Sequence, residues 1–298
     1  PSTRNSYAQH IKNSLKPHIG SVRLQKLTAP MLQSLYRQRL EGMSERPAVS
    51  AKTVKNLHGV IHSALKQAVD IDYLLVNPAD KCKLPKVTKF EYKPLGDLLP
   101  DFLQAIKGHS YELLYLTDLY TGLRESELIG LTWDCVDFDR ALIRVYRQFQ
   151  RVAKECLWLS LKSNKARVIP APPVVLDVLR EQRRRQAEMK LAAGSLWSNP
   201  DHLVFTNEIG RYVSYETVYK NFKAIVRTLG APETRFHDLR HQYAISALQS
   251  GVNIKMVQEA LGHHTAAFTL DTYACVTGEM QRDAAAKIDA YYKALQTQ

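Results

Sequence analysis

The segment from Arg235 to Tyr273 contains side chains whose types and spacing could carry out phosphoryl transfer. His237 and Arg240 are three residues apart, so on a helix they would share one face. The fork of an arginine matches the oxygens of a phosphate and keeps its charge. A tyrosine hydroxyl, with a pKa of about 10, becomes a covalent nucleophile when a neighbour accepts its proton and cations hold the electrophile. Together with His263, these residues predict a site that opens a phosphate ester.

The residues before His263 predict the helix that would bring it to this site. Asn253 can cap the start of that helix. The apolar residues that follow recur three and four apart, at Ile254, Val257 and Leu261. Gly262 suits the left-handed turn that ends a helix, and His263 comes directly after it. We therefore expect His263 to lie close to His237 and Arg240.

Two further cations outside this segment are candidates for the same site. Thr121 and Gly122 predict a turn that presents Arg124 at the start of the next helix, and Glu127 can orient that arginine. Lys162 lies in the connection between two predicted strands and is a candidate proton donor. Lys165 shares this connection and remains the alternative.

The charge of the chain is concentrated in its first third. The 298 residues carry a net charge of +12, and residues 1–93 hold 16 Lys and Arg against 6 Asp and Glu. Residues 94–298 are almost neutral, with 25 against 23. A basic domain joined to a nearly neutral one suggests a grip on nucleic acid attached to a region with another task. The alternative is a solvated basic surface.

Composition narrows the class of protein further. The apolar fraction of 45% is that of a soluble globular protein, and no run of about 18 apolar residues predicts a membrane span. The four cysteines are scattered without a Cys-x-x-Cys pair, which favours a reducing, cytoplasmic setting and predicts no zinc knuckle or disulfide framework.

The hydrophobic periodicity predicts a mainly α fold with a small antiparallel β-sheet, divided into two domains. Residues 1–84 read as an all-helical basic domain, and 85–94 as a basic linker. Residues 95–278 read as a mixed α/β domain whose sheet of about three strands lies within 141–170. Residues 279–298 read as an amphipathic helix with its apolar stripe at Met280, Ala284, Ile288, Tyr291 and Leu295.

Three stretches, TGLRESELIGLTW, HDLRH and LGHHTAAFTLDTY, resemble the conserved boxes of the tyrosine recombinases, most closely the integrases of phages and conjugative transposons. The resemblance covers the second domain almost end to end. The first domain is similar to the core-binding domain of that family in position, charge and helical pattern. The resemblance implies a two-domain DNA clamp that acts as a site-specific recombinase or integrase of a mobile element.

The resemblance also implies a role for each matching residue. Arg124 and Arg240 would grip the scissile phosphate, and Tyr273 would attack it to give a 3′-phosphotyrosine and a free 5′-hydroxyl. Lys162 would protonate the leaving 5′-oxygen. His237 would serve in proton transfer.

His263 would donate to a phosphate oxygen, and Glu127 would hold Arg124. The family's chemistry needs no cofactor and no metal, because the phosphotyrosine keeps the bond energy. The partners implied are double-stranded DNA with a specific core site, a homo-oligomer of two to four subunits on that DNA, and accessory DNA-bending proteins. Such integrases often carry an amino-terminal arm-binding domain, for which we find no room in this chain.

We expect the phosphate backbone to be contacted by lysines of the first domain and the linker. These are Lys52, Lys55, Lys66, Lys83, Lys86 and Lys89. The terminal helix 279–298 either folds back on its own chain or docks on a neighbouring subunit. We expect docking, because its apolar stripe directly follows the nucleophile.

Three other functions use the same residues differently. A type IB topoisomerase shares the chemistry but would relax DNA without strand exchange. A metal-dependent nuclease or protease would use the pair His237 and His241 with His263 and His264, although Asp238 stands where a zinc protease has glutamate. A DNA-binding regulator without catalysis would lack some of the six candidate residues, and all six are present.

Overall fold

The computed structural model describes residues 2–42, 47–87, 95–152, 155–161 and 165–263, with isolated positions beyond them. The main division of the chain into two compact units falls between Glu91 and Tyr92. Lys89, Lys162 and Tyr273, most of the predicted linker and most of the predicted terminal helix lie outside the described residues. No helix in the described part of the chain is both long and apolar enough to cross a membrane.

The first unit opens with one long helical stretch formed by α1 (Ser2–His10), a π-helical turn (Ile11–Leu15) and α2 (Lys16–Ile19). Pro17 lies in the first turn of α2, and the helix continues to Ile19 with Gly20 at its end. The π turn shifts the backbone hydrogen-bond register just before Pro17. The helix can therefore continue through Pro17 although this residue has no backbone N–H to donate. The apolar residues Tyr7, Ile11 and Leu15 along this stretch are only partly buried, because Tyr7 and Ile11 are exposed.

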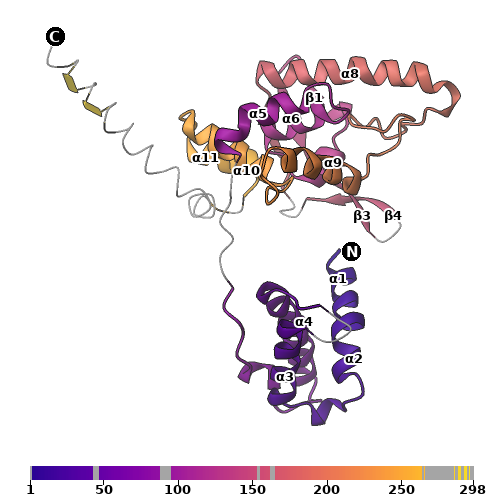
Figure 1. The fold of residues 1–298 in the computed structure, drawn as a ribbon, viewed down its shortest axis with the longest axis vertical. Coiled ribbons are helices and arrows are strands. Elements are labelled where there is room, and N and C mark those ends of the chain that lie inside the picture. Colours follow the sequence, from indigo (N-terminus) through magenta and orange to yellow (C-terminus); the bar gives the residue numbers. More distant parts are fainter. Residues whose placement is uncertain are drawn as a thin grey trace. The chain divides into compact units, whose positions relative to one another are not determined.

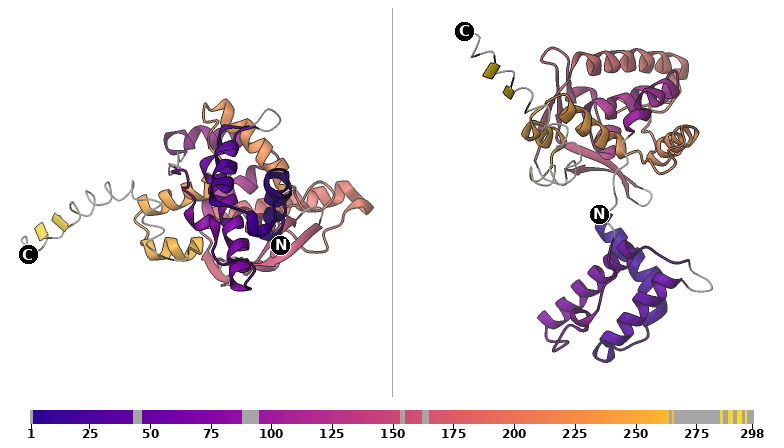
Figure 2. Two further views of the ribbon diagram at one scale, coloured as in Figure 1. Left: turned by 90° about the horizontal axis from the view of Figure 1, so that it is seen from below. Right: turned by 60° about the vertical axis from the view of Figure 1, so that its left-hand side comes forward.

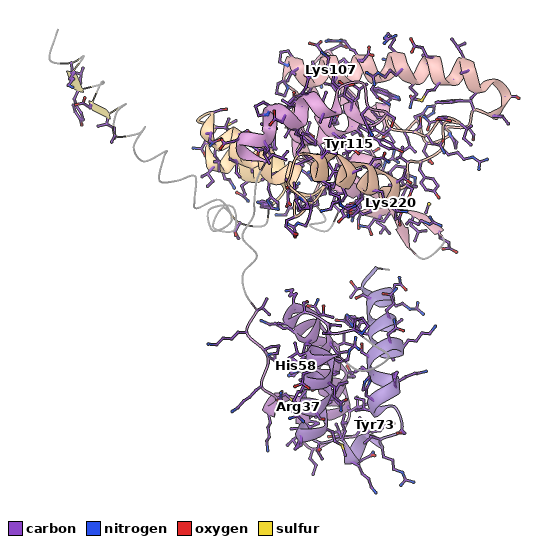
Figure 3. All side chains as sticks on the ribbon, viewed as in Figure 1. Arg37, His58, Tyr73, Lys107, Tyr115 and Lys220 are labelled. Atoms are coloured by element: carbon purple, nitrogen blue, oxygen red, sulfur yellow. The ribbon has the colours of Figure 1, made fainter. Side chains whose placement is uncertain are left out.

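The core of the first unit forms between α3 (Ala29–Glu41) and α4 (Ala51–Asp70). Figure 2 shows the helices of this unit packed side by side. Short 3₁₀ turns at Leu24–Lys26 and Pro78–Lys81 flank these helices. Ser50 caps α4, since its side chain accepts a hydrogen bond from the backbone N–H of Thr53. His58, labelled in Figure 3, contacts the buried hydroxyl of Tyr36 at 3.0 Å across the interface. Apolar burial along this pair of helices holds the unit together.

The second unit is built around α6 (Glu112–Thr121), which packs against α8 (Pro173–Ala193) and α10 (Asp238–Gln249), as Figure 1 shows. Tyr115, labelled in Figure 3, is fully buried at the centre of an aromatic cluster. Its ring contacts Phe102 of α5 (Leu99–Ile106), Phe222 of α9 (Tyr215–Thr228) and Phe236 before α10. This core fixes the ends of α6 and α10, where the candidate site residues lie.

The strands within the described residues form two small sheets, not the single sheet predicted from the sequence. One is antiparallel and contains β1 (Val136–Asp137), β2 (Leu142–Val145) and β5 (Arg167–Pro170). The other pairs β3 (Arg147–Val152) with β4 (Glu155–Ser160). The connection that contains Lys162 therefore runs between two sheets and does not close a hairpin of paired strands. Alternation along each strand was readable from the sequence, but strand pairing depends on tertiary packing that periodicity does not encode.

Candidate active site

Arg240 is almost completely buried, at 2% exposed, and its guanidinium joins the ends of two helices. Its Nη1 donates to the carbonyl of Gly122 at 2.5 Å, directly after α6. Its Nη2 donates to the carbonyl of Leu261 at 2.5 Å, at the end of α11 (Ile254–Leu261). The final carbonyls of a helix lack intrahelical partners and carry partial negative charge, so they suit a buried cation.

Both of these helix ends depend on a glycine in the left-handed conformation. Gly122 has φ 59°, and an added Cβ would lie 2.9 Å from Cδ2 of Leu261. Gly262 has φ 62° and ends α11, whose first turn Asn253 caps through the N–H of Lys255 at 2.8 Å. Both features of α11 were predicted from the sequence. They allow the backbone to turn sharply enough for its carbonyls to face the arginines.

Arg124 converges on the same turn from α7 (Glu125–Ile129). Its Nη2 donates to the carbonyl of Gly262 at 2.8 Å, one residue beyond the carbonyl that Arg240 contacts. Glu127 accepts two hydrogen bonds from Arg124, one from Nη1 to its Oε1 at 2.8 Å and one from the backbone N–H to its Oε2 at 2.8 Å. Two arginines that are more than a hundred residues apart in the chain therefore meet at consecutive carbonyls of one turn.

The histidines His237 and His263 lie within this cluster of cations, and both are held in the neutral form. His237 precedes the first turn of α10, and burial together with the charge of Arg240 lowers its pKa to about 4. His263 follows Gly262, and burial together with Arg240 and Arg124 lowers its pKa to about 3. At neutral pH each imidazole can therefore donate at one nitrogen and accept at the other.

Arg167 is a member of this cluster that was not identified from the sequence. It opens β5, and its Nη2 contacts Oε2 of Glu127 at 2.6 Å. The strand pattern held a signal, because period-two alternation places Arg167 on the same side as the buried Ile169. An arginine on the inner side of a strand needs a buried partner, and the structure shows that this partner is Glu127.

Asp118 on α6 is a second residue that was not identified from the sequence. It is 1% exposed, and neither carboxylate oxygen has a hydrogen-bond partner among the described residues. Burial and the nearby Glu125 raise its pKa well above the ordinary value, against the opposing effect of Arg240. An aspartate inside an apolar helical pattern gave no signal of this position.

A cavity of about 540 Å³ opens beside Arg124 and His237. Residues of β3 and the start of α9 form much of its wall, including Gln148, Arg151 and Tyr215. Arg235 also lines it and is held by Asp238, whose Oδ1 receives the Nη2 of Arg235 at 2.7 Å. Arg124 and Arg235 therefore place positive charge on this wall of the cavity, and Glu125 lies beside Arg124 there.

The remaining sequence candidates lie elsewhere or outside the described residues. Lys52, Lys55 and Lys66 are exposed on one side of α4, and Lys83 and Lys86 are exposed after the first unit's last helical turn. Lys162, Tyr273 and Lys89 cannot be placed, since they fall outside the described ranges. Within those ranges, no three His, Cys, Asp or Glu side chains gather where they could hold a metal ion.

Comparison with known proteins identifies the family of this chain. The model of the "Phage integrase family" matches residues 88–279. A "Tyrosine recombinase XerC-like" protein of Caldanaerobacter subterraneus is 30% identical over 303 residues, which cover 95% of this chain and 76% of that protein. The ICEBs1 integrase of Bacillus subtilis is 25% identical, with 96% and 78% covered. The chain therefore belongs to the phage integrase family of tyrosine recombinases, enzymes of site-specific DNA recombination.

Solved structures share the fold across nearly the whole chain. The Tn1549 transposon integrase in complex with transposon right end DNA matches with a TM-score of 0.75 at 20% identity, covering 95% of this chain and 94% of that one. A lambda integrase dimer bound to a core site matches with a TM-score of 0.63 at 15% identity, covering 89% of each chain. The predicted mainly α fold with little β structure is confirmed by these likenesses, although its single predicted sheet is in fact two within the described residues.

Proposed function

We propose that this protein cleaves and rejoins DNA strands at a specific core site through a 3′-phosphotyrosine, in the integration and excision of a mobile element. The observation that carries the proposal is the convergence of Arg124 and Arg240 on the carbonyls of Gly262 and Leu261. The turn holds two guanidinium groups side by side, and the neutral His263 follows it. Such a cluster matches the charge of a phosphodiester during attack.

In the proposed reaction, the hydroxyl oxygen of Tyr273 bonds to phosphorus while the bond from phosphorus to the 5′-oxygen breaks. Arg124 and Arg240 stabilise the charge that develops on the non-bridging oxygens. Fixed donors of this kind contribute several kcal/mol, and the loss of one commonly slows a reaction by about 10²–10³. The arginines need no reorganisation, since carbonyls and Glu127 already hold them.

The histidines suit proton handling because burial and the neighbouring arginines keep them neutral. We assign His237, which is neutral at pH 7 and so keeps one ring nitrogen free to accept, to taking the proton of the tyrosine hydroxyl. His263 donates to a phosphate oxygen. We assign Lys162 to protonating the leaving 5′-oxygen, with Lys165 as the alternative. A 5′-hydroxyl of another strand then reverses the steps and rejoins the DNA.

We propose that the first unit grips the DNA backbone. Lys52, Lys55 and Lys66 lie on one stripe of α4, exposed and spaced by nearly whole helical turns. Such a stripe can follow successive phosphates of a duplex. Lys83, Lys86 and Lys89 continue the positive charge along the chain into the proposed linker 85–94, which precedes the proposed catalytic domain, residues 95–278.

We propose that two to four copies act together on DNA in the cytoplasm, helped by accessory DNA-bending proteins. The described positions of the terminal segment support a docking role for residues 279–298. Ile288, Tyr292 and Leu295 are 57%, 60% and 51% exposed and helical. Deletion of residues 279–298 should weaken the pairing of two DNA sites while leaving single-site binding intact.

The catalytic assignment is tested with a nicked core-site substrate that traps the covalent intermediate. Tyr273→Phe should bind this DNA with unchanged affinity and form no adduct, in excess chelator as well as without it. Chelator would abolish cleavage by a metal-dependent nuclease. An undiminished adduct with Tyr273→Phe would contradict the assignment. Relaxation of nonspecific supercoiled DNA without strand exchange would favour a topoisomerase.

A further inference from the structure

The guanidinium of Arg167 makes three hydrogen bonds beside Arg124 and Arg240. Arg167 is the first residue of β5, and its side chain is 9% exposed. Its Nη1 and Nη2 donate to the two oxygens of Glu127 at 3.0 and 2.6 Å. Its Nε donates to the carbonyl of Ala260 at 2.7 Å. One guanidinium therefore joins β5, α7 and the last turn of α11.

Glu127 is shared equally by two arginines. Its Oε1 accepts from Nη1 of Arg124 at 2.8 Å and from Nη1 of Arg167 at 3.0 Å. Its Oε2 accepts from the backbone N–H of Arg124 at 2.8 Å and from Nη2 of Arg167 at 2.6 Å. The carboxylate is 1% exposed, so this arrangement is the only solvation it has among the described residues. Burial raises the pKa of Glu127, but Arg167 and Arg124 outweigh that effect and lower it to about 2.

The contact with Ala260 extends this arrangement to the turn that precedes His263. A Cβ added at Gly262 would lie 3.2 Å from Cδ of Arg167, so the turn rests directly on the arginine side chain. The next contact along the chain is the carbonyl of Gly262, which receives Nη2 of Arg124. Arg167 therefore supports both partners of Arg124, the carboxylate of Glu127 and the Gly262 carbonyl.

We infer that Arg167 is a positioning residue for strand cleavage, which holds Arg124 and the His263 turn in the geometry that receives the scissile phosphate. The inference rests on the proposed function. Arg167 acts through Glu127 and Ala260, because its three nitrogen atoms are all directed to these partners and its side chain is nearly inaccessible. It also anchors the strand that follows the connection containing Lys162.

The first test compares Arg167→Met and Arg167→Lys in single-turnover cleavage of a nicked core-site substrate at saturating protein. Arg167→Met should slow adduct formation by about 10²-fold, the effect typical of a displaced charge donor, and change the Kd for DNA less than about 3-fold. Arg167→Lys should recover less than about 10-fold of that loss, since an ammonium group cannot form the two-pronged contact and reach Ala260. Arg185→Met is the control. Arg185 lies on α8, and like Arg167 it pairs with two carboxylate oxygens, here from Glu181 and Glu112. The cleavage rate of this control should stay at the wild-type level.

A double-mutant cycle tests whether Arg167 acts through Glu127. Glu127→Gln should leave two arginines without their shared counter-charge, so adding Arg167→Met should cost less than about 3-fold further in rate. If Arg167 bound the phosphate itself, the two losses would multiply. If Arg167→Met does not fold, Arg167→Lys and the Glu127→Gln/Arg167→Lys double variant give the same comparison.

Three outcomes would overturn the inference alone, in a protein whose wild-type form gives the adduct. These are a wild-type cleavage rate for Arg167→Met, multiplicative losses in the cycle, or a loss of DNA affinity as large as the loss of rate. A wild-type protein that forms no adduct at all would overturn the proposed function, and this inference with it.

Discussion

The positive charges of the two units are held in opposite ways. On α4 of the first unit, Lys52, Lys55 and Lys66 are exposed on one stripe of the helix. In the second unit, Arg240 is 2% exposed and Arg167 is 9% exposed, with each guanidinium directed by carbonyls or by Glu127. Exposed charges remain hydrated and are interchangeable, so they suit binding. Buried, directed charges are fixed before the substrate arrives, so they suit chemistry.

The largest effect should come from replacing the most deeply buried of these arginines. Arg240→Lys should slow strand cleavage by about 10³-fold or more, because a lysine cannot donate to Gly122 and Leu261 together and still bind a phosphate. The free energy of unfolding should fall by about 2–4 kcal/mol, since one helix-terminal carbonyl loses its charged donor. Single-turnover cleavage and urea unfolding measure the two effects. A rate within tenfold of wild type would show that the buried charge is structural.

The exposed lysines should show the reverse pattern. The triple variant Lys52→Gln, Lys55→Gln and Lys66→Gln should weaken DNA binding, and the slope of log K against log salt should fall by about 0.9 for each phosphate that the protein no longer neutralises. Cleavage at saturating protein and the free energy of unfolding should not change. Lys107→Gln, an exposed lysine at the end of α5 in the other unit, is the control. An unchanged salt slope in the triple variant would remove α4 from the DNA interface.

The buried histidines should make the second unit sensitive to mild acid. The pKa of His237 is lowered to about 4 and that of His263 to about 3, below the ordinary value of 6.5. The folded state therefore binds fewer protons than the unfolded state, and stability falls as the pH drops below about 6.5. We expect a loss on the order of 1–2 kcal/mol for each histidine by pH 5. Urea unfolding between pH 5 and 8 measures it, and His237→Gln should flatten the curve. A curve that His237→Gln leaves unchanged would show that His237 is not buried in the neutral form.

The smallest effect should come from Asp118, the buried acid without a hydrogen-bond partner among the described residues. Its raised pKa means that the folded state holds a proton which the unfolded state releases, so this group lowers stability as pH rises above its ordinary range. Asp118→Asn should therefore be neutral or up to about 1 kcal/mol more stable at pH 7. The charged groups that act on Asp118, which are Glu125, Arg240 and Glu127, stay in place in this variant, so the change tests the burial of Asp118 itself. A loss of more than about 1 kcal/mol would indicate an ion pair with Arg240.

Features that depend on residues close together in the chain could be predicted from the sequence. Local signals located α11 from Asn253 and Gly262, because capping chemistry depends on neighbouring residues. The motifs around Arg124, His237, Arg240 and His263 also predicted the convergence of these residues, although their catalytic roles stay predictions.

Interactions between distant segments were not predictable in this way. The pairing of β5 with β2, the π turn before Pro17 and the sharing of Glu127 by Arg124 and Arg167 all depend on tertiary packing. Alternation could place Arg167 on the inner side of its strand, but nothing in the sequence showed which carboxylate lay opposite. The buried Asp118 has the same explanation, since an aspartate within a helix is ordinarily exposed.

The central claim is that buried arginines hold a DNA phosphate for attack by one tyrosine. The most direct measurement is mass spectrometry of the trapped adduct after nuclease and protease digestion. We expect the peptide that contains Tyr273 to carry a nucleotide joined through its 3′-phosphate. A nucleotide on any other residue, or one joined through its 5′-phosphate, would contradict this claim.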